Sequence, residues 1–145
     1  MATRERRERS NESDRFLRSL FTEAARDLSG LALAAVGGYG RGELSPGSDL
    51  DILFLHNGKI DEKILGELVN KVLYPLWDKS FKVDHSVRTR SETRESARSD
   101  LKVALGLLDI RLICGDADLV AAVQHDAIDD WHSNSRERLP ELRSS

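Results

Sequence analysis

The feature that most constrains this chain is a glycine-rich loop between two apolar runs, in the segment VGGYGRGELSPGSDLDILFL at residues 36–55. The run before the loop, LALAAV at residues 31–36, has the length of a buried strand, and so has the run that follows it. Because side chains alternate between the two faces of a strand, Asp49 and Asp51 leave the second strand on the same face. The loop therefore brings two carboxylates side by side at the start of a strand.

The composition limits what such a chain can be. Its 145 residues, 39% apolar and 32% charged, fit one soluble globular domain with a single core. A net charge of −3 argues against a nucleic-acid binder that works by general phosphate neutralisation. Cys114 is the only cysteine, and no apolar run reaches the roughly 18 residues of a membrane span. We therefore expect a cytoplasmic protein with neither a membrane nor a nucleic acid as partner.

Apolar periodicity and capping residues predict the order helix, strand, strand, helix, strand and then helices along the chain. In chain order they are an amphipathic helix from Asp14 to Leu28, strands over 31–36 and 49–55, a helix over 60–77, a strand over 81–88, a helix begun by the capping pair Thr89 and Glu92, a mostly buried helix that Ser99 caps and Gly115 ends, and a last helix over 119–131. This order predicts an α/β (α+β) domain over residues 14–131, with helices packed on a small mixed sheet. Residues 1–13 are expected to form a frayed tail, and residues 132–145 a polar tail or the start of a further region.

The spacing of Asp49 and Asp51 favours a metal site. Their Cβ atoms lie about 6 to 7 Å apart on an extended strand, and two carboxylates at that distance repel each other at neutral pH unless a cation lies between them. Oxygen ligands of this kind suit Mg²⁺, which takes few protein ligands and completes its coordination with water and substrate phosphates. On these two residues alone, a pair of solvated acids at a sheet edge remains the alternative.

The residues before the two acids suit phosphate binding. Gly37, Gly38 and Gly42 lack a Cβ, so that backbone N–H groups can approach a phosphate closely. The forked guanidinium of Arg41 can donate to the same oxygens. Neither the dinucleotide pattern G-x-G-x-x-G nor the P-loop pattern G-x-x-x-x-G-K-[ST] fits residues 37–47. The segment is thus interpreted as a different cradle for a triphosphate and a metal.

Three motifs in order carry a resemblance to a known family: GGYGRGELSPGSDLDIL at residues 37–53, HSVRT at 85–89 and SDLKVALGLLDIRLICGD at 99–116. The first is similar to nucleotidyltransferases of the polymerase-β superfamily. Over about residues 14–130 the chain resembles the amino-terminal nucleotidyltransferase domain of the PII-protein uridylyltransferase/uridylyl-removing enzymes, the GlnD family. This resemblance implies a polymerase-β-like nucleotidyltransferase fold and transfer of UMP from UTP, or of AMP from ATP in some lineages, to a tyrosine of the PII nitrogen-signalling protein.

The resemblance also implies a role for six residues: Gly37, Gly38 and Ser48 would contact the triphosphate, and Asp49, Asp51 and Asp84 would hold two Mg²⁺ ions. Asp84, on the following strand, would help to deprotonate the attacking hydroxyl. Its alternative is an edge-strand acid that pairs with Lys82 or Arg88. Enzymes of the family are several-fold longer and carry a hydrolytic HD domain and glutamine-sensing ACT domains after this one, so the uridylyl-removing activity is not expected here.

Two other functions stay open at this point. A glutamine-synthetase adenylyltransferase domain has a similar glycine loop and Ser-Asp-Leu-Asp run, although HSVRT favours the PII enzyme. A noncatalytic nucleotide-sensing or protein-binding module would keep the cradle without turnover. His85, on the apolar face of its strand, is expected to be a core histidine, and Arg111 either contacts a phosphate or stabilises the end of its helix.

Overall fold

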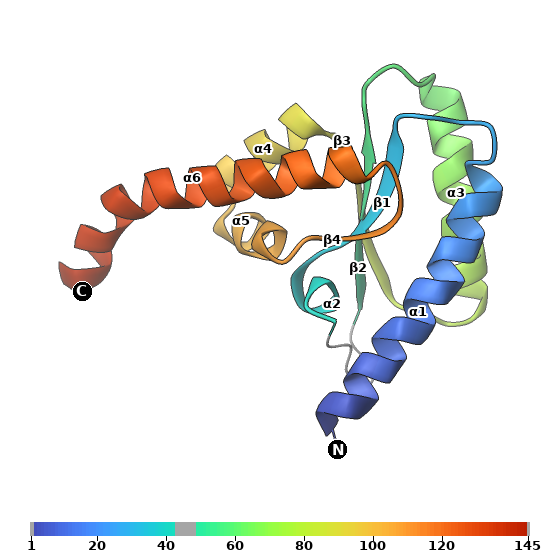
Figure 1. Ribbon diagram of the computed structural model, residues 1–145, viewed down its shortest axis with the longest axis horizontal. Coiled ribbons are helices and arrows are strands. Elements are labelled where there is room, and N and C mark those ends of the chain that lie inside the picture. Colours follow the sequence, from blue (N-terminus) through green and yellow to red (C-terminus); the bar gives the residue numbers. More distant parts are fainter. Residues whose placement is uncertain (1, 43–48, 145) are drawn as a thin grey trace.

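The computed structural model describes the backbone of residues 2–42 and 49–144 and the side chains of residues 4–42 and 49–133. Its helices and strands follow the expected order, with an additional one-turn helix in the glycine-rich loop and an additional strand near the end of the expected buried helix (Figure 1). In chain order they are α1 (Ala2–Ala24), β1 (Leu31–Ala35), α2 (Gly37–Gly40), β2 (Leu50–His56), α3 (Glu62–Asp78), β3 (Val83–Thr89), α4 (Arg90–Ser99), α5 (Leu101–Leu108), β4 (Arg111–Gly115) and α6 (Ala117–Ser144).

Within the described residues, the strands form one mixed sheet in the order β3-β2-β1-β4. β1 runs antiparallel to both of its neighbours, β2 and β4. β2 and β3 run parallel, because α3 carries the chain from one end of the sheet back to the other between them. The prediction of an α+β domain with a small mixed sheet is therefore confirmed.

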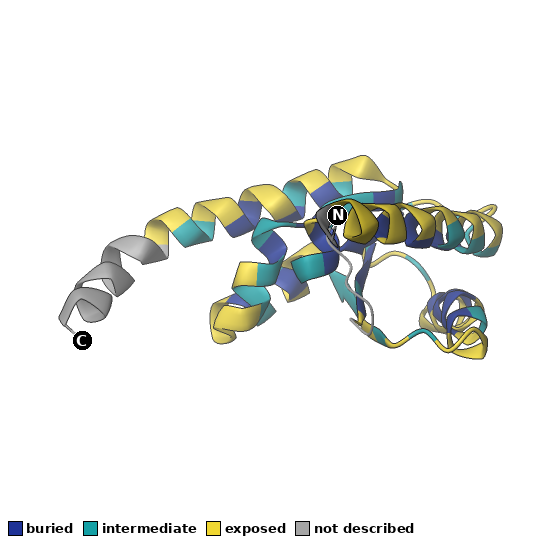
Figure 2. Cartoon of the chain, turned by 90° about the horizontal axis from the view of Figure 1, so that it is seen from below, coloured by how far each residue is buried: buried dark blue, intermediate teal, exposed yellow. Residues whose placement is uncertain are grey.

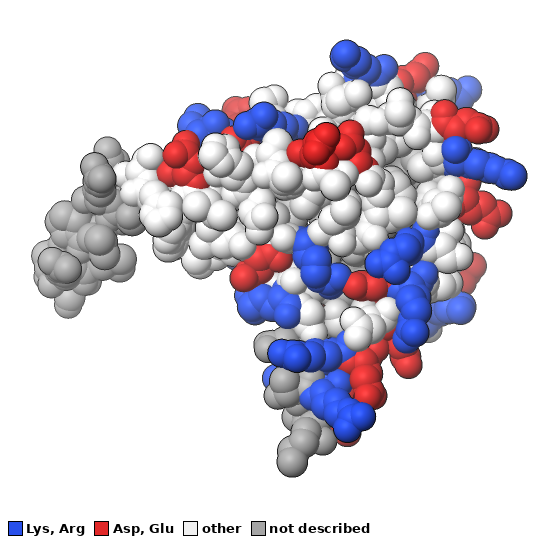
Figure 3. Space-filling view, in the orientation of Figure 1, with Lys and Arg blue, Asp and Glu red and all other residues white. Residues whose placement is uncertain are grey.

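Helices cover both faces of the sheet, so alternate residues of the central strands enter two different cores (Figure 1). Leu31, Leu33 and Ala35 of β1 pack toward α1 and α3, whereas Ala32 and Ala34 pack toward the side of α5 and α6. Figure 2 shows the buried residues on the inner sides of the helices and the exposed ones on their outer sides. On the face shown in Figure 3, lysine and arginine side chains gather over α1, with acidic ones between them.

Local capping explains where several helices begin. The Asp61 side chain accepts a hydrogen bond from the Lys63 N–H at the start of α3. At the start of α4, the Thr89 side chain bonds to the backbone of Glu92 and the Glu92 side chain bonds back to the backbone of Thr89. The capping box expected from these two residues is thus confirmed.

The helix expected from Ser99 to Gly115 is wrong in its second half. Asp100, not Ser99, caps α5, which ends at Leu108, and β4 follows. β4 pairs with β1, so the sheet supplies its backbone hydrogen bonds. A continuously apolar run is buried equally well as helix or strand, and its periodicity does not distinguish the two. Gly115 accordingly ends a strand and not a helix.

The first helix begins at Ala2 rather than at Asp14. The segment before Asp14 is rich in charged residues and has no apolar stripe, so the sequence gives no periodic signal for a helix there. The structure nevertheless buries Ser10 and Ser13 of this segment, with 1% and 4% of their surfaces exposed. No helix in the described part of the chain is both long and apolar enough to span a membrane.

Candidate active site

Asp51 and Asp84 stand next to each other on the same face of the sheet. The parallel pairing of β2 and β3 puts the two residues in register, and neighbouring strands lie about 4.8 Å apart. Asp51 leaves β2 on the side of Leu53 and Leu55, toward α4 and α5 rather than toward α1 and α3. The sequence predicted both acids, and the crossover through α3 brings them together.

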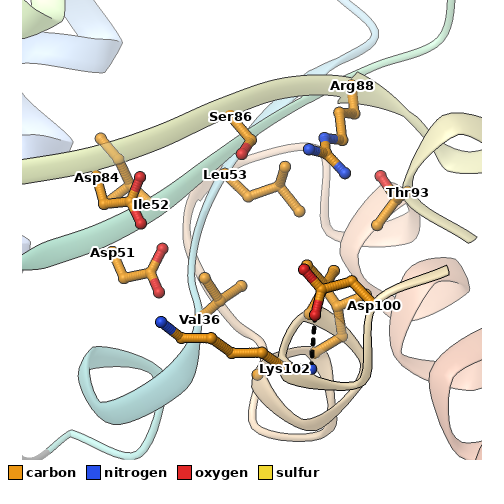
Figure 4. A pocket seen from close by; sticks show the side chains of 13 residues that line it. Val36, Asp51, Ile52, Leu53, Asp84, Ser86, Arg88, Thr93, Asp100 and Lys102 are labelled. Carbon is orange, nitrogen blue, oxygen red and sulfur yellow. Dashed lines mark hydrogen bonds between the residues drawn. The ribbon is translucent and has the colours of Figure 1, made fainter. Parts of the chain in front are cut away.

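The two carboxylates lie in a cavity of about 280 Å³ between the sheet and the helices α4 and α5 (Figure 4). Its described lining consists of Val36, Asp51, Ile52, Leu53, Asp84, Ser86, Arg88, Thr93, Asp100, Lys102, Val103, Gly106 and Leu107. In Figure 4 the Lys102 ammonium points toward Asp51, and the Arg88 guanidinium points into the cavity from further along β3. The cavity thus has an acidic end, an apolar floor and two cations on its walls.

The electrostatics of this cavity act mainly on Asp51. The pKa of its carboxyl is raised from 3.8 to about 6, first by burial and then by the negative charge of Asp84. The Lys102 ammonium lowers the pKa, and Asp49 adds a smaller increase. Without a bound cation, the site therefore favours a protonated Asp51 more than water does.

A glycine lets the backbone approach this carboxylate. Gly37 follows β1 with φ +59, a conformation that suits glycine. A Cβ at this position would lie 3.3 Å from Asp51 Oδ2, and one on Gly106 would lie 3.6 Å from the Gly37 nitrogen. Because these glycines have no side chain, α2 packs closely between β2 and α5, and its first residue contacts the acidic end of the cavity. Gly38 follows in the same turn and is partly exposed.

The other expected site residues lie around this centre. Asp49 is exposed, directly before β2. Arg41 donates from Nη1 to Asp109 Oδ2 at 3.0 Å, so part of its guanidinium is already paired. Gly42 has φ +74, and no atom of the described residues lies within 4 Å of where its Cβ would be. Ser48 lies outside the described residues.

The sequence did not point to Lys102, Arg88 or Gly106 as site residues. Lys102 lies in the run that the sequence predicts as a long, mostly buried helix, and a charged side chain in such a run is the one feature that could have marked it as a site residue. Arg88 belongs to the HSVRT motif, whose position on β3 brings every second side chain to the cavity. His85 falls on the opposite side of β3 and is exposed, so the expectation of a core histidine is wrong.

The donor set fits a divalent cation that arrives with phosphates. Among the described residues, no group of three acidic, histidine or cysteine side chains is arranged to hold a metal on its own. Mg²⁺, however, is commonly bound by one or two carboxylates with phosphate and water completing its shell. Asp51 and Asp84 provide such a pair, and a cation between them would offset both the burial and the repulsion by Asp84 that raise the pKa of Asp51.

Comparison with protein families agrees with this geometry. The family model described as "Nucleotidyltransferase domain" matches residues 17–105, which is more than half of the chain. The chain belongs to the nucleotidyltransferase domain family. This membership confirms the expectation of an enzyme of the nucleotidyltransferase type and of the corresponding fold. The matched segment contains the glycine loop, Asp51 and Asp84.

The expected resemblance to uridylyltransferases is also confirmed. The chain is 49% identical over 131 residues to the bifunctional uridylyltransferase/uridylyl-removing enzyme of Streptomyces coelicolor, and the match covers 90% of this chain but 16% of that protein. Enzymes of the same name from Mycobacterium tuberculosis and Vibrio campbellii are 47% and 40% identical, over 80% and 81% of this chain and 14% of each enzyme. The chain therefore spans about one sixth or less of the length of these relatives.

Solved structures support the fold at much lower identity. The toxin–antitoxin complex MntA–HpeT contains a chain that superposes with a TM-score of 0.54 at 16% identity, over 88% of this chain and 96% of that one. A toxin–antitoxin structure with AMP-PNP gives a TM-score of 0.53 at 18% identity, with the same two coverages. These likenesses concern the fold of the nucleotidyltransferase domain.

Proposed function

We propose that this domain transfers UMP from UTP, or AMP from ATP, to a tyrosine of the PII nitrogen-regulatory protein and releases pyrophosphate. The observation that carries the proposal is the in-register pair Asp51 and Asp84 at the end of a cavity of about 280 Å³, with Gly37 against one of the carboxylates. The choice of uridylyl transfer rests on the 40–49% identity to enzymes of that name. The reaction draws on nucleotides of the cytoplasm, so we expect the protein to act there.

The proposed cofactor is Mg²⁺, with two ions implied by the resemblance to the family. When bound, it would act as a Lewis acid that neutralises charge on the α-phosphate. Asp51 and Asp84 would hold it from the two strands, and Asp49 would contribute from the start of β2. Because protons compete with the metal for a carboxylate ligand, the raised pKa of Asp51, about 6, predicts weaker metal binding below that pH.

Other residues around the cavity would bind the phosphates and accept the proton. Gly37 and Gly38 would leave room for the triphosphate beside Asp51, and the Lys102 ammonium would neutralise phosphate oxygens from α5. The Asp84 carboxylate would accept the proton of the tyrosine hydroxyl while the tyrosine oxygen attacks the α-phosphorus. A new bond joins the tyrosine oxygen to this phosphorus, the bond to the oxygen that bridges to the β-phosphate breaks, and pyrophosphate leaves.

Label transfer tests this proposal. The chain is incubated with Mg²⁺ and either UTP or ATP labelled at the α-phosphate, with purified PII protein or glutamine synthetase as acceptor. We expect label on PII, and a rate at least about 100-fold lower for Asp51→Asn and Asp84→Asn, because charge stabilisation at the reacting phosphate is lost. Asp27→Asn, which alters an exposed acid in the turn after α1, should leave the rate unchanged.

The other outcomes separate the alternatives. Labelling of glutamine synthetase instead of PII would point to the adenylyltransferase of that enzyme. Nucleotide binding without any release of pyrophosphate would indicate a noncatalytic binding module. Full activity in Asp51→Asn would remove Asp51 from the mechanism.

A further inference from the structure

A partly buried polar network outside the cavity joins three elements that are far apart in the sequence. Arg111 of β4 donates from both Nη atoms to the carboxylate of Asp14 on α1. The Tyr39 hydroxyl of α2 donates to Asp14 Oδ1 at 2.6 Å. Asp14 and Tyr39 are 8% and 2% exposed, and the Ser10 hydroxyl lies 3.4 Å from Arg111 Nη2. Among the described residues that line the cavity, none belongs to this network.

The same arginine also binds the backbone of α2. Its Nη2 donates to the Tyr39 carbonyl at 2.9 Å, and its Nε donates to the Gly40 carbonyl at 3.2 Å. α2 is a single turn with the sequence Gly-Gly-Tyr-Gly, which has little tendency to form a helix alone. The conformation of this turn therefore depends on contacts from outside it, and Arg111 supplies two of them.

The network also keeps its hydrogen-bond pattern at physiological pH. Burial and the hydrogen bond to Asp14 raise the pKa of the Tyr39 hydroxyl, so Tyr39 remains a donor. An arginine–aspartate pair that is largely withdrawn from water often adds no net stability compared with apolar side chains of the same size, because desolvation offsets the attraction between the charges. Its consequence is geometric, since the planar guanidinium holds its acceptors in fixed directions.

The helix α2, which this network holds, contacts the acidic end of the cavity. The first residue of α2 is Gly37, whose Cβ position lies 3.3 Å from Asp51 Oδ2, and the Val36 N–H donates to the Asp51 carbonyl at 3.0 Å. A shift of α2 would thus displace backbone at the carboxylate that we propose to hold the metal. The glycine pair in this turn is also the segment that the proposed function places along the triphosphate.

We propose that Arg111, anchored by Asp14, is a positioning residue that fixes α2 beside Asp51 and so sets the affinity of the site for a nucleoside triphosphate. This inference rests on the proposed function. Because Arg111 acts on α2, its effect should fall on the phosphates beyond the α-phosphate and spare a nucleoside monophosphate. Tyr39 supports the arrangement through its bond to Asp14.

Arg18 provides a matched control. Like Arg111, it joins α1 to β4, since its Nε donates to the Ile113 carbonyl at 3.1 Å, but no hydrogen bond of Arg18 to α2 occurs in the described structure. Arg111→Met and Arg18→Met therefore both weaken the docking of α1, and only the first releases α2. Tyr39→Phe is a milder variant that keeps the ring and removes only the hydroxyl donor, in case Arg111→Met does not fold.

Amide hydrogen exchange gives a readout that needs no nucleotide. In α2 and the turn after it, the N–H groups of Gly40, Arg41 and Gly42 donate to Val36, Gly37 and Tyr39. We expect these amides to exchange at least about tenfold faster in Arg111→Met and about fivefold faster in Tyr39→Phe, with no more than about a twofold change in Arg18→Met. Unchanged exchange in Arg111→Met, or equal acceleration in the two arginine variants, would overturn the positioning role.

Calorimetric titration with UTP and with UMP, both in Mg²⁺, links the network to the site. Arg111→Met should bind UTP at least about tenfold more weakly and UMP within about twofold of the wild type, while Arg18→Met should match the wild type for both. Equal losses for UTP and UMP would contradict the proposal. If the wild-type chain binds neither nucleotide, the proposed function fails, while the exchange measurement still decides whether Arg111 positions α2.

Discussion

At the scale of single residues, Asp51 is placed where the unliganded protein disfavours its charge. Burial and the adjacent Asp84 raise its pKa to about 6, against 3.8 for a carboxyl in water. A group whose folded-state pKa is raised contributes stability that is present below its unfolded pKa and is lost as the pH rises through the folded pKa. For Asp51 this loss falls between about pH 4 and pH 6.

Because ionisation of Asp51 lowers the stability of the folded state, we expect Asp51→Asn to stabilise the unliganded chain at neutral pH. The amide is uncharged, so at pH 7.5 the free energy of unfolding should rise by about 1 kcal/mol, less than the full pKa shift implies because the residue is partly exposed to solvent. The gain should shrink toward pH 4, where the wild-type carboxyl is protonated. Urea unfolding at the two pH values measures this, with Asp27→Asn as the exposed control, and a loss of stability at pH 7.5 would contradict it.

Lys102 is the cation that partly offsets this penalty, because its ammonium lowers the pKa of Asp51. Lys102→Met should raise that pKa further and weaken the binding of UTP with Mg²⁺ at pH 7.5 by about tenfold, as expected for one charge-assisted contact. Lys71→Met, an exposed position on α3, is the control for the loss of a charge. Titration calorimetry with the three proteins decides this, and equal affinities would exclude Lys102 from the site.

Residue patterns predicted the acids of the site but only part of their surroundings. The alternation of side chains on a strand is enough to put Asp49 and Asp51 on one face, and the register of β3 then brings Asp84 beside Asp51. Lys102 and Arg88 reach the same cavity through the packing of α5 and the end of β3. Such long-range packing leaves no local signal in a single sequence.

At the scale of elements, the boundary between α5 and β4 is what periodicity could not predict. The apolar run that contains both is compatible with either structure, and pairing with β1 selects a strand. Gly115 makes that pairing possible, because its φ of +102 and its contact with β1 exclude a side chain. This boundary matters for function, because Arg111 lies on the strand that supports α2 and not on the helix expected from the sequence.

Two glycine substitutions test this assignment with opposite signs. In Gly115→Ala the new Cβ would lie 2.5 Å from the Leu31 carbonyl oxygen, so we expect a loss of about 3 kcal/mol or more in the free energy of unfolding. Gly66 is exposed within α3, and none of the residues that the structure describes comes within 4 Å of its Cβ position, so Gly66→Ala should add up to about 1 kcal/mol. Chemical denaturation measures both, and a neutral Gly115→Ala would mean that β4 does not pair as described.

At the scale of the whole molecule, one face of the sheet packs against supporting helices and the other carries the candidate active site. α1 and α3 cover one face (Figure 1), and the cavity opens on the other, between the sheet and the helices α4 and α5. The order of helices and strands along the chain predicted this class of fold, but it did not predict the strand order that puts β1 in the interior of the sheet. The chain spans 16% of the Streptomyces coelicolor enzyme. Whether this part binds nucleotide on its own is therefore the first property to establish.

Calorimetric titration of UTP into the wild-type chain and into Asp51→Asn, each with Mg²⁺ and with EDTA, measures whether Asp51 holds a cation that binds together with the nucleotide. We expect the wild type to bind UTP only when Mg²⁺ is present and Asp51→Asn to bind it at least about 100-fold more weakly, because the carboxylate that faces Asp84 no longer helps to hold the ion. Equal affinity of the two proteins for UTP, or wild-type binding that does not depend on Mg²⁺, would contradict this role of Asp51.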